Sequence, residues 1–95
     1  MSEPSVWTRQ AKALLRAEMA RREVTYGELA RRLHEHGFDE TAKNVSNKIG
    51  RGKFSAAFLL AALVALGVRR PDLTALVEAV EEELAQASGG GSGDS

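Results

Sequence analysis

The sequence has no cysteine, which excludes disulfide bonds, thiolate metal sites and a cysteine nucleophile. Histidine is scarce as well, since the chain contains only His34 and His36. Two positions apart on a helix, these side chains point in different directions, so they cannot hold one metal ion together. We therefore expect neither a metal nor any other cofactor.

Long apolar runs are also missing. No stretch reaches the ~18 apolar residues that a membrane-spanning helix needs. The first residues, MSEPSVWTRQ, lack the basic-then-apolar layout of a signal peptide. We expect a cytoplasmic protein that does not associate with membranes.

The side-chain constellations of common active sites are absent too. The C-terminal glycines follow a predicted helix rather than a strand, so they lack the context of a phosphate-binding loop. No serine has a histidine and a carboxylate in a plausible nucleophile arrangement. The acidic run of residues 81–83 fans around a helix instead of forming a pair. We expect no enzymatic activity and no small-molecule ligand.

The charges that are present are divided unevenly along the chain. Residues 1–70 hold all 13 basic residues and 7 of the 13 acidic ones, a net charge of +6. Residues 71–95 hold the other 6 acidic residues and no basic one. This asymmetry predicts that the first part meets an anionic partner, while the last part faces solvent or a basic surface. The alternative is that both are ordinary solvated surfaces.

Hydrophobic periodicity predicts five helices and no strand. The first spans residues 5–22, with an apolar stripe made of Trp7, Ala11, Leu14, Leu15 and Met19. The second begins at Tyr26 and runs to about His36, where Gly37 ends it. It follows a capping box, in which the Thr25 hydroxyl accepts from the Glu28 amide and the Glu28 carboxylate reaches back to Thr25.

The third predicted helix covers about residues 40–49, with Asp39 or Thr41 as its cap. The fourth, residues 56–66, is apolar all round, so we expect it to be buried among the others. The fifth opens at Pro71 and Asp72. We expect the large aromatic residues to be core or core-edge anchors, namely Trp7, Phe38, Phe54 and Phe58.

The second and third helices form a helix-turn-helix pattern, joined by a turn of three or four residues that begins with Gly37. The major groove of DNA admits one helix, on which asparagine pairs with adenine and arginine or lysine with guanine. The outward stripe of the third helix carries these residue types. We assign base reading to Thr41, Lys43, Asn44, Asn47, Lys48 and Arg51.

Nearby basic side chains are assigned to the DNA backbone, where they would position the protein without reading sequence: Arg31, Arg32 and Lys53. Glu40 argues against this interpretation, because it lies on the same stripe and would repel phosphate unless it accepts from a cytosine or only caps the helix. The alternative role of Asn44 and Asn47 is to solubilise a surface helix.

The order of these helices resembles the lambda-repressor-like (phage repressor and Cro type) DNA-binding domain. The matching residues are 28–30 in the second helix, 51–53 after the third, and the apolar fourth helix. The resemblance implies a helix-turn-helix fold with double-stranded DNA as its partner. A narrower resemblance, to a bacterial family of small proteins of unknown function, covers residues 7–68 and rests on Trp7, Ala11, Lys12, Tyr26, Leu29, Ala30, Asn44, residues 47–49 and residues 51–55.

We therefore expect an all-α fold, a compact five-helix domain with a central helix-turn-helix. Residues 1–4 are predicted to be an N-terminal tail and 5–70 the four-helix domain. Residues 71–87 form the acidic amphipathic helix, and 88–95 (SGGGSGDS) a flexible tail.

The fifth helix carries a short seam of heptad character, made of Leu73, Val77, Val80 and Leu84. A helix of this length is marginal alone, so it must pack on something. One expectation is that it docks on the fourth helix of its own domain. The alternative is a homodimer through this seam, which would set two recognition helices about 34 Å apart.

Two functional hypotheses follow. The first is a small transcriptional regulator that binds double-stranded DNA with sequence preference. The second is a non-enzymatic helical module that binds a protein, such as an adaptor or antitoxin-like partner, through the acidic fifth helix or an exposed apolar patch.

Overall fold

The computed structural model describes the backbone of residues 5–91 and the side chains of residues 5–87. Within this range the chain forms five helices and no strand: α1 (Ser5–Arg22), α2 (Tyr26–Glu35), α3 (Ala42–Arg51), α4 (Ala56–Leu66) and α5 (Thr74–Gly91). The predicted all-α class is confirmed, and α1 and α4 have the predicted bounds. The fifth helix begins at Thr74 rather than at Pro71, and it continues through residues 88–91, which were assigned to the flexible tail. The rest of the segments assigned to tails, residues 1–4 and 92–95, lie outside the described residues.

The connection between α2 and α3 is longer than predicted, since residues 36–41 separate the two helices. Gly37 takes a left-handed conformation (φ 91°), and the amide of Phe38 donates to the carbonyl of Leu33 at 3.0 Å. These contacts end α2 in a Schellman-type turn. Thr41 caps α3, because its hydroxyl accepts from the amide of Asn44 at 3.1 Å.

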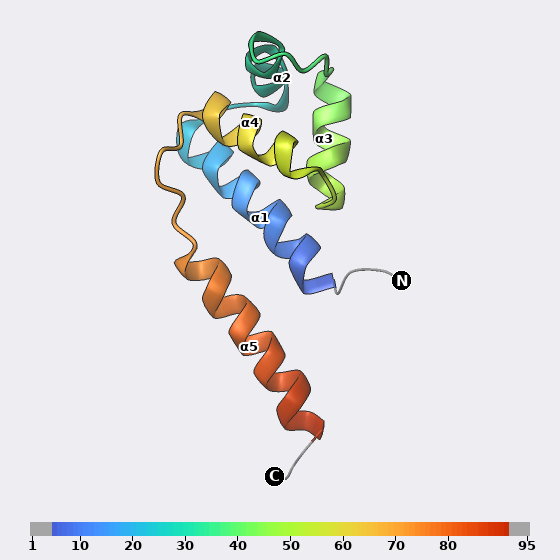
Figure 1. Ribbon diagram of the computed structural model, residues 1–95, viewed down its shortest axis with the longest axis vertical. Coiled ribbons are helices and arrows are strands. Elements are labelled where there is room, and N and C mark those ends of the chain that lie inside the picture. The colour runs from blue at the N-terminus through green and yellow to red at the C-terminus, as the bar shows by residue number, and fades with distance from the viewer. Residues whose placement is uncertain (1–4, 92–95) are drawn as a thin grey trace.

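Helices α1 to α4 enclose the main core (Figure 1). Its largest fully buried side chains are Leu15, Leu29, Leu33, Val45, Ile49 and Phe58. The rings of Phe38 and Phe54 pack against Phe58, with centroids 6.1 and 5.5 Å away. The three phenylalanines are therefore core or core-edge anchors as predicted. The same prediction was wrong for Trp7, whose residue surface is 46% exposed.

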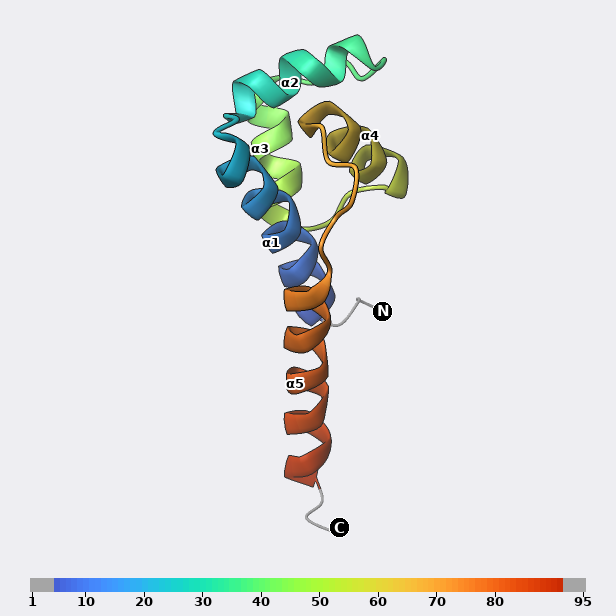
Figure 2. The same ribbon diagram turned by 90° about the vertical axis from the view of Figure 1, so that its left-hand side faces the viewer.

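Helix α5 stands apart from this core. Among the described helices it contacts only α1. Figure 1 shows the two helices running in opposite directions, and in Figure 2 the C-terminal half of α5 projects beyond the other helices. The expectation that α5 docks on α4 is therefore wrong. The contact between the two helices buries Val80 of α5, and at its exposed edge Glu83 of α5 forms an ion pair with Arg9 of α1.

Because α5 lies elsewhere, α4 is not buried on all sides as predicted. Leu60 and Val64, one helical turn apart on α4, are 63% and 60% exposed. No single helix in the described part of the chain is long and apolar enough to cross a bilayer, and α3 and α4 meet that composition only together, across a bend of 117°.

The end of α3 lies directly against the start of α1. Gly52 follows α3 in a left-handed conformation (φ 66°), and a Cβ atom at this position would lie 2.0 Å from the carbonyl oxygen of Thr8. Both the backbone angle and the lack of space require glycine. The approach of these two backbones sets how the C-terminal end of α3 is held against α1.

Gly52→Ala should lower the free energy of unfolding by about 2–5 kcal/mol, because it adds a left-handed alanine to a clash with backbone atoms. Gly37→Ala is the matched control, since Gly37 also has a positive φ but a Cβ atom there would have no other atom within 4 Å. It should cost only the conformational part, about 1–2 kcal/mol. Urea denaturation of both variants measures the difference, and equal losses would contradict the close approach to Thr8.

Candidate nucleic-acid interface

The outward face of α3 is set by the two residues that hold the helix in the core. Val45 and Ile49 are completely buried. At 100° per residue, the opposite side of the helix carries polar and basic residues. The predicted base-reading residues that are exposed there are Lys43, Asn44, Asn47 and Arg51. We call these four residues the α3 face.

The remaining two predicted base-reading residues lie elsewhere. Thr41 is exposed at the N-terminal edge of α3, where its hydroxyl caps the helix. Lys48 turns toward α4: its Nζ lies 2.5 Å from the Glu40 carboxylate and 5.1 Å from the centroid of the Phe58 ring. The structure therefore does not bring Lys48 onto the α3 face.

The same ion pair changes the role of Glu40. The sequence placed this carboxylate on the outward stripe, where it would repel phosphate. In the structure Glu40 precedes α3, its side chain is only 10% exposed, and Lys48 neutralises it. That expectation was wrong because α3 begins at Ala42 rather than at about residue 40, so Glu40 precedes the helix instead of lying on its outward side. The α3 face itself carries no acidic residue.

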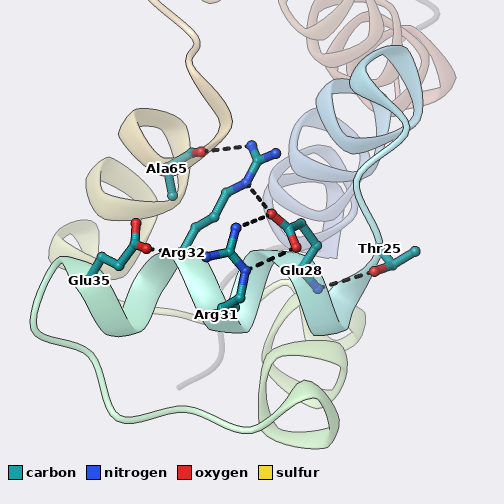
Figure 3. A network of polar contacts seen from close by, with 6 residues as sticks. All are labelled: Thr25, Glu28, Arg31, Arg32, Glu35 and Ala65. Carbon is teal, nitrogen blue, oxygen red and sulfur yellow. Dashed lines mark hydrogen bonds and ion pairs between the residues drawn. The ribbon is translucent and has the colours of Figure 1, made fainter.

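Two of the predicted phosphate-contacting residues, Arg31 and Arg32, are bonded within the fold (Figure 3). Arg31 pairs with Glu28 at 2.5 Å and with Glu35 at 3.2 Å. Arg32 pairs with Glu28 at 2.9 Å and donates to the carbonyl of Ala65 at 3.1 Å. In Figure 3 the Arg32 guanidinium extends toward the end of α4, the Arg31 guanidinium lies in front of α2, and α3 lies below α2.

The contact with Ala65 has a structural purpose. The last carbonyls of a helix have no partner within it, and Ala65 precedes the end of α4 by one residue. Arg32 satisfies this carbonyl and so ties α2 to the end of α4. The third predicted phosphate-contacting residue, Lys53, is exposed in the loop directly after α3.

The predicted capping box is present in one direction only. The Thr25 hydroxyl accepts from the Glu28 amide at 3.1 Å, as predicted. The Glu28 carboxylate accepts from Arg31 and Arg32 instead of reaching back to Thr25. The hydrogen bonds from Arg31, and then those from Arg32, lower the pKa of Glu28 to about 2.

Internal ion pairs thus divide the basic residues into two groups. Arg21 and Arg22 at the end of α1 both pair with Glu18, which is buried. Within the described residues, the basic side chains that form no ion pair with a carboxylate are Lys12, Arg16, Lys43, Arg51, Lys53, Arg69 and Arg70. Three of them are on α3 or directly follow it, so the α3 face is cationic.

Arg16 is a basic residue that sequence reasoning did not connect with the α3 face. Its Nε donates to the hydroxyl of Tyr26 at 3.2 Å, and its guanidinium lies 3.8 Å from where a Cβ of Gly50 would be. Periodicity showed only that Arg16 lies off the apolar stripe of α1. The contact with α3 depends on how the two helices cross, which no local pattern reveals.

The predicted seam on α5 is divided between two environments. Val80 is buried in the contact with α1, whereas Leu73, Val77 and Leu84 are 45%, 43% and 53% exposed. We call these three exposed residues the α5 ridge. Within the described part of the chain, the helix that carries them is supported on the α1 side alone.

A small groove runs between α1 and α5. Its volume is about 140 Å³, and its walls are mainly apolar, with Arg21 and Asp72 among the lining residues. Drug-sized ligands occupy cavities of about 300–1,000 Å³. The groove is therefore too small to change the expectation that no small-molecule ligand is bound.

Comparison with known proteins identifies a family. Residues 7–71 match the family model described as "Domain of unknown function (DUF6471)". The match covers α1 from its third residue, all of α2 to α4, and the first part of the connection to α5. No curated protein and no solved structure matches the chain.

The pKa of Glu28 tests the ion-pair network directly. Arg31→Ala should raise this pKa from about 2 toward the ordinary value of 4.5, because it removes the largest cause of the shift. Arg51→Ala is the control, since Arg51 is not among the groups that shift this pKa. Titration of the carboxyl group by NMR in both variants measures the effect, and a Glu28 pKa that stays near 2 in Arg31→Ala would contradict the network.

The lowered pKa of Glu28 also determines how the stability of the fold changes with pH. The folded state releases the Glu28 proton more readily than the unfolded state, so its contribution is fully present above about pH 4.5 and is lost as the pH falls toward 2. The difference in unfolding free energy between the wild type and Glu28→Gln should shrink across that window. A difference that does not depend on pH there would contradict the assignment.

Proposed function

The chain belongs to the family DUF6471, a domain of unknown function, and we propose that it is a small regulator that binds double-stranded DNA. In this proposal α2 and α3 act as a helix-turn-helix pair of the lambda-repressor-like type. The α3 face enters the major groove and reads base edges. Lys53 contacts a phosphate beside it.

The observation that carries the proposal is the chemistry of the α3 face. It consists of two amides and two cations, all exposed. Asparagine can pair with the two hydrogen-bonding groups of adenine, and arginine or lysine with the acceptors of guanine. The Glu40 carboxylate, which would have opposed an approach to phosphate, is turned inward and paired with Lys48.

The charge around α3 supports the same partner. The sequence from Thr41 to Pro71 contains six basic residues and no acidic one. The arginines of α2 and of the end of α1 are neutralised by carboxylates within the fold. Of the six basic residues between Thr41 and Pro71, Lys48 is paired with Glu40, and residues 69 and 70 lie in the connection after α4. The unpaired cations on α3 or just after it are Lys43, Arg51 and Lys53, and attraction to a polyanion would act on them.

The low helix propensity of the two asparagines on the α3 face also favours a functional role for them. Asparagine is a poor helix former, by roughly 0.6 kcal/mol relative to alanine. Asn44 and Asn47 are both exposed on α3, and neither supports the core. Lysine or glutamate would keep the surface soluble at less cost, whereas a base-reading helix needs the amides.

A second candidate function, self-association, is favoured by the α5 ridge. Its three aliphatic side chains are exposed on a helix that, among the described helices, contacts only α1. By helical periodicity, Glu78 and Glu82 lie on the side opposite Val80, so they would stay outside a seam formed with a second copy. We propose that the ridge is where two copies meet as a homodimer.

DNA binding is tested by selection from random duplexes at two salt concentrations. Log K should fall with log salt at a slope of about −0.9 per contacted phosphate. Asn47→Ala should reduce the preference at one base pair by about 1–3 kcal/mol. Lys53→Ala should weaken binding to all sequences alike and make the slope shallower by about 0.9, the value for one phosphate contact.

Arg31→Ala is the matched control for Lys53→Ala. It removes the same charge, but from α2, where Arg31 is bonded to Glu28 and Glu35. It should leave the salt slope unchanged. The absence of binding to any duplex at low salt would eliminate the proposal.

Self-association is tested by light scattering over a range of protein concentrations. If the α5 ridge joins two copies, the double variant Val77→Glu/Leu84→Glu should have the mass of one chain. Leu60→Glu is the control, because it places a charge on the other exposed apolar surface, that of α4. A wild-type mass of one chain at all concentrations would rule out the dimer, and loss of the dimer in Leu60→Glu alone would move the contact to α4.

A further inference from the structure

We infer that Arg16 of α1 forms a phosphate-binding subsite beside the α3 face, held in position by Tyr26 of α2 and left open by Gly50 of α3. The inference rests on the proposed DNA binding and deepens it. It assigns a backbone contact to a helix outside the helix-turn-helix pair.

The first observation is that one nitrogen of the Arg16 guanidinium, Nε, is hydrogen-bonded within the fold, while the terminal nitrogens remain available in the described part of the chain. Its Nε donates to the Tyr26 hydroxyl at 3.2 Å, and the ring of Tyr26 packs against the main core. The guanidinium is thus fixed to a rigid support. Arginine has further N–H donors, and a planar group with two free donors matches two oxygens of a phosphate.

The second observation is that α3 has a glycine, Gly50, and thus no side chain, next to this guanidinium. Gly50 is helical, so its backbone angles do not require glycine. Glycine is nevertheless a poor residue for a helix. A Cβ at Gly50 would lie 3.8 Å from a terminal nitrogen of Arg16, and any longer side chain would cover that nitrogen. The glycine keeps the guanidinium accessible from the α3 side.

The third observation is an uncompensated charge. Lys12 and Arg16 are four residues apart on α1, so they share one side of the helix, and like charges at this spacing repel. Neither forms an ion pair with a carboxylate among the described residues. Arg21 and Arg22 on the same helix are both paired with Glu18. An anion bound at Arg16 would relieve this repulsion.

The ligand is a phosphate of the DNA backbone rather than a base. Arg16 comes from α1 and lies to the side of α3, near the C-terminal end of the helix, whereas base edges are reached by the side chains that point straight out of it. With Lys53 in the loop after α3, Arg16 would give the recognition helix contacts with the phosphates that flank the groove. Such contacts fix orientation and register.

The experiment measures the affinity of the full-length protein for its selected duplex and for a scrambled duplex in a salt series. Arg16→Ala should weaken binding to both duplexes by the same factor, roughly tenfold at about 0.1 M salt, and reduce the slope of log K against log salt by about 0.9. Arg16→Lys keeps the charge but cannot reproduce the planar donor set, so it should keep the slope and recover only part of the affinity. Circular dichroism checks that the variants are folded.

Arg21→Ala is the matched control on the same helix. Arg21 lines the groove next to α5, and Glu18 keeps Arg22 as a partner when Arg21 is removed. This variant should leave affinity and slope unchanged. An equal loss of slope in Arg21→Ala would overturn the subsite, because the effect would then be one of total charge.

The outcomes also separate the subsite from the proposed function. If the wild type binds and Asn47→Ala loses sequence preference, but Arg16→Ala keeps the wild-type slope, the subsite is wrong and the DNA-binding proposal stands. A lower melting temperature of Arg16→Ala with an unchanged slope would mean that Arg16 only stabilises the contact between α1 and α3. If the wild type binds no duplex, both are wrong.

Discussion

The orientation of α3 depends on the approach of Gly52 to the backbone of Thr8. This contact leaves no room for a side chain, and it fixes the C-terminal end of α3 on α1. The cap at Thr41 and the pair between Glu40 and Lys48 hold the other end. Between the two ends, Val45 and Ile49 are buried in the core. Residues outside the α3 face therefore determine which side of α3 points outward.

Carboxylates within the fold decide where the positive charge is available. Glu18, Glu28 and Glu40 each bind lysine or arginine side chains, and in doing so they join neighbouring turns or helices. The same contacts neutralise the arginines at the end of α1 and on α2. The cations of α1 and α3 that have no carboxylate partner among the described residues lie around a face without acidic residues. A chain with no net charge thus presents a locally basic surface.

Local patterns predicted the helices well, because caps and periodicity act over a few residues. Thr25 and Thr41, two of the caps proposed from the sequence, each accept from the amide three residues later, and Ser55 caps α4 in the same way. The errors concern partners far apart in sequence. The exposure of Trp7 and the inward position of Glu40 depend on how helices and loops pack. So does the reach of Arg16 to α3, which joins residues more than thirty positions apart.

The position of α5 was missed for a similar reason. Both α1 and α4 offered apolar surface, and periodicity does not distinguish between them. The ion pair with Arg9 and the burial of Val80 put α5 on α1. As a consequence, part of α4 is exposed. The sequence did not reveal this, because the apolar run of α4 predicted a helix buried on all sides.

Among the described residues, the main core contains no side chain from α5. Local stability in a protein follows the number of buried contacts that an element makes. The last helix can therefore melt and re-form while α1 to α4 stay folded, and its amide protons would exchange with solvent long before those of Leu29 or Ile49. The chain thus contains two units that differ in local stability, α1 to α4 and α5.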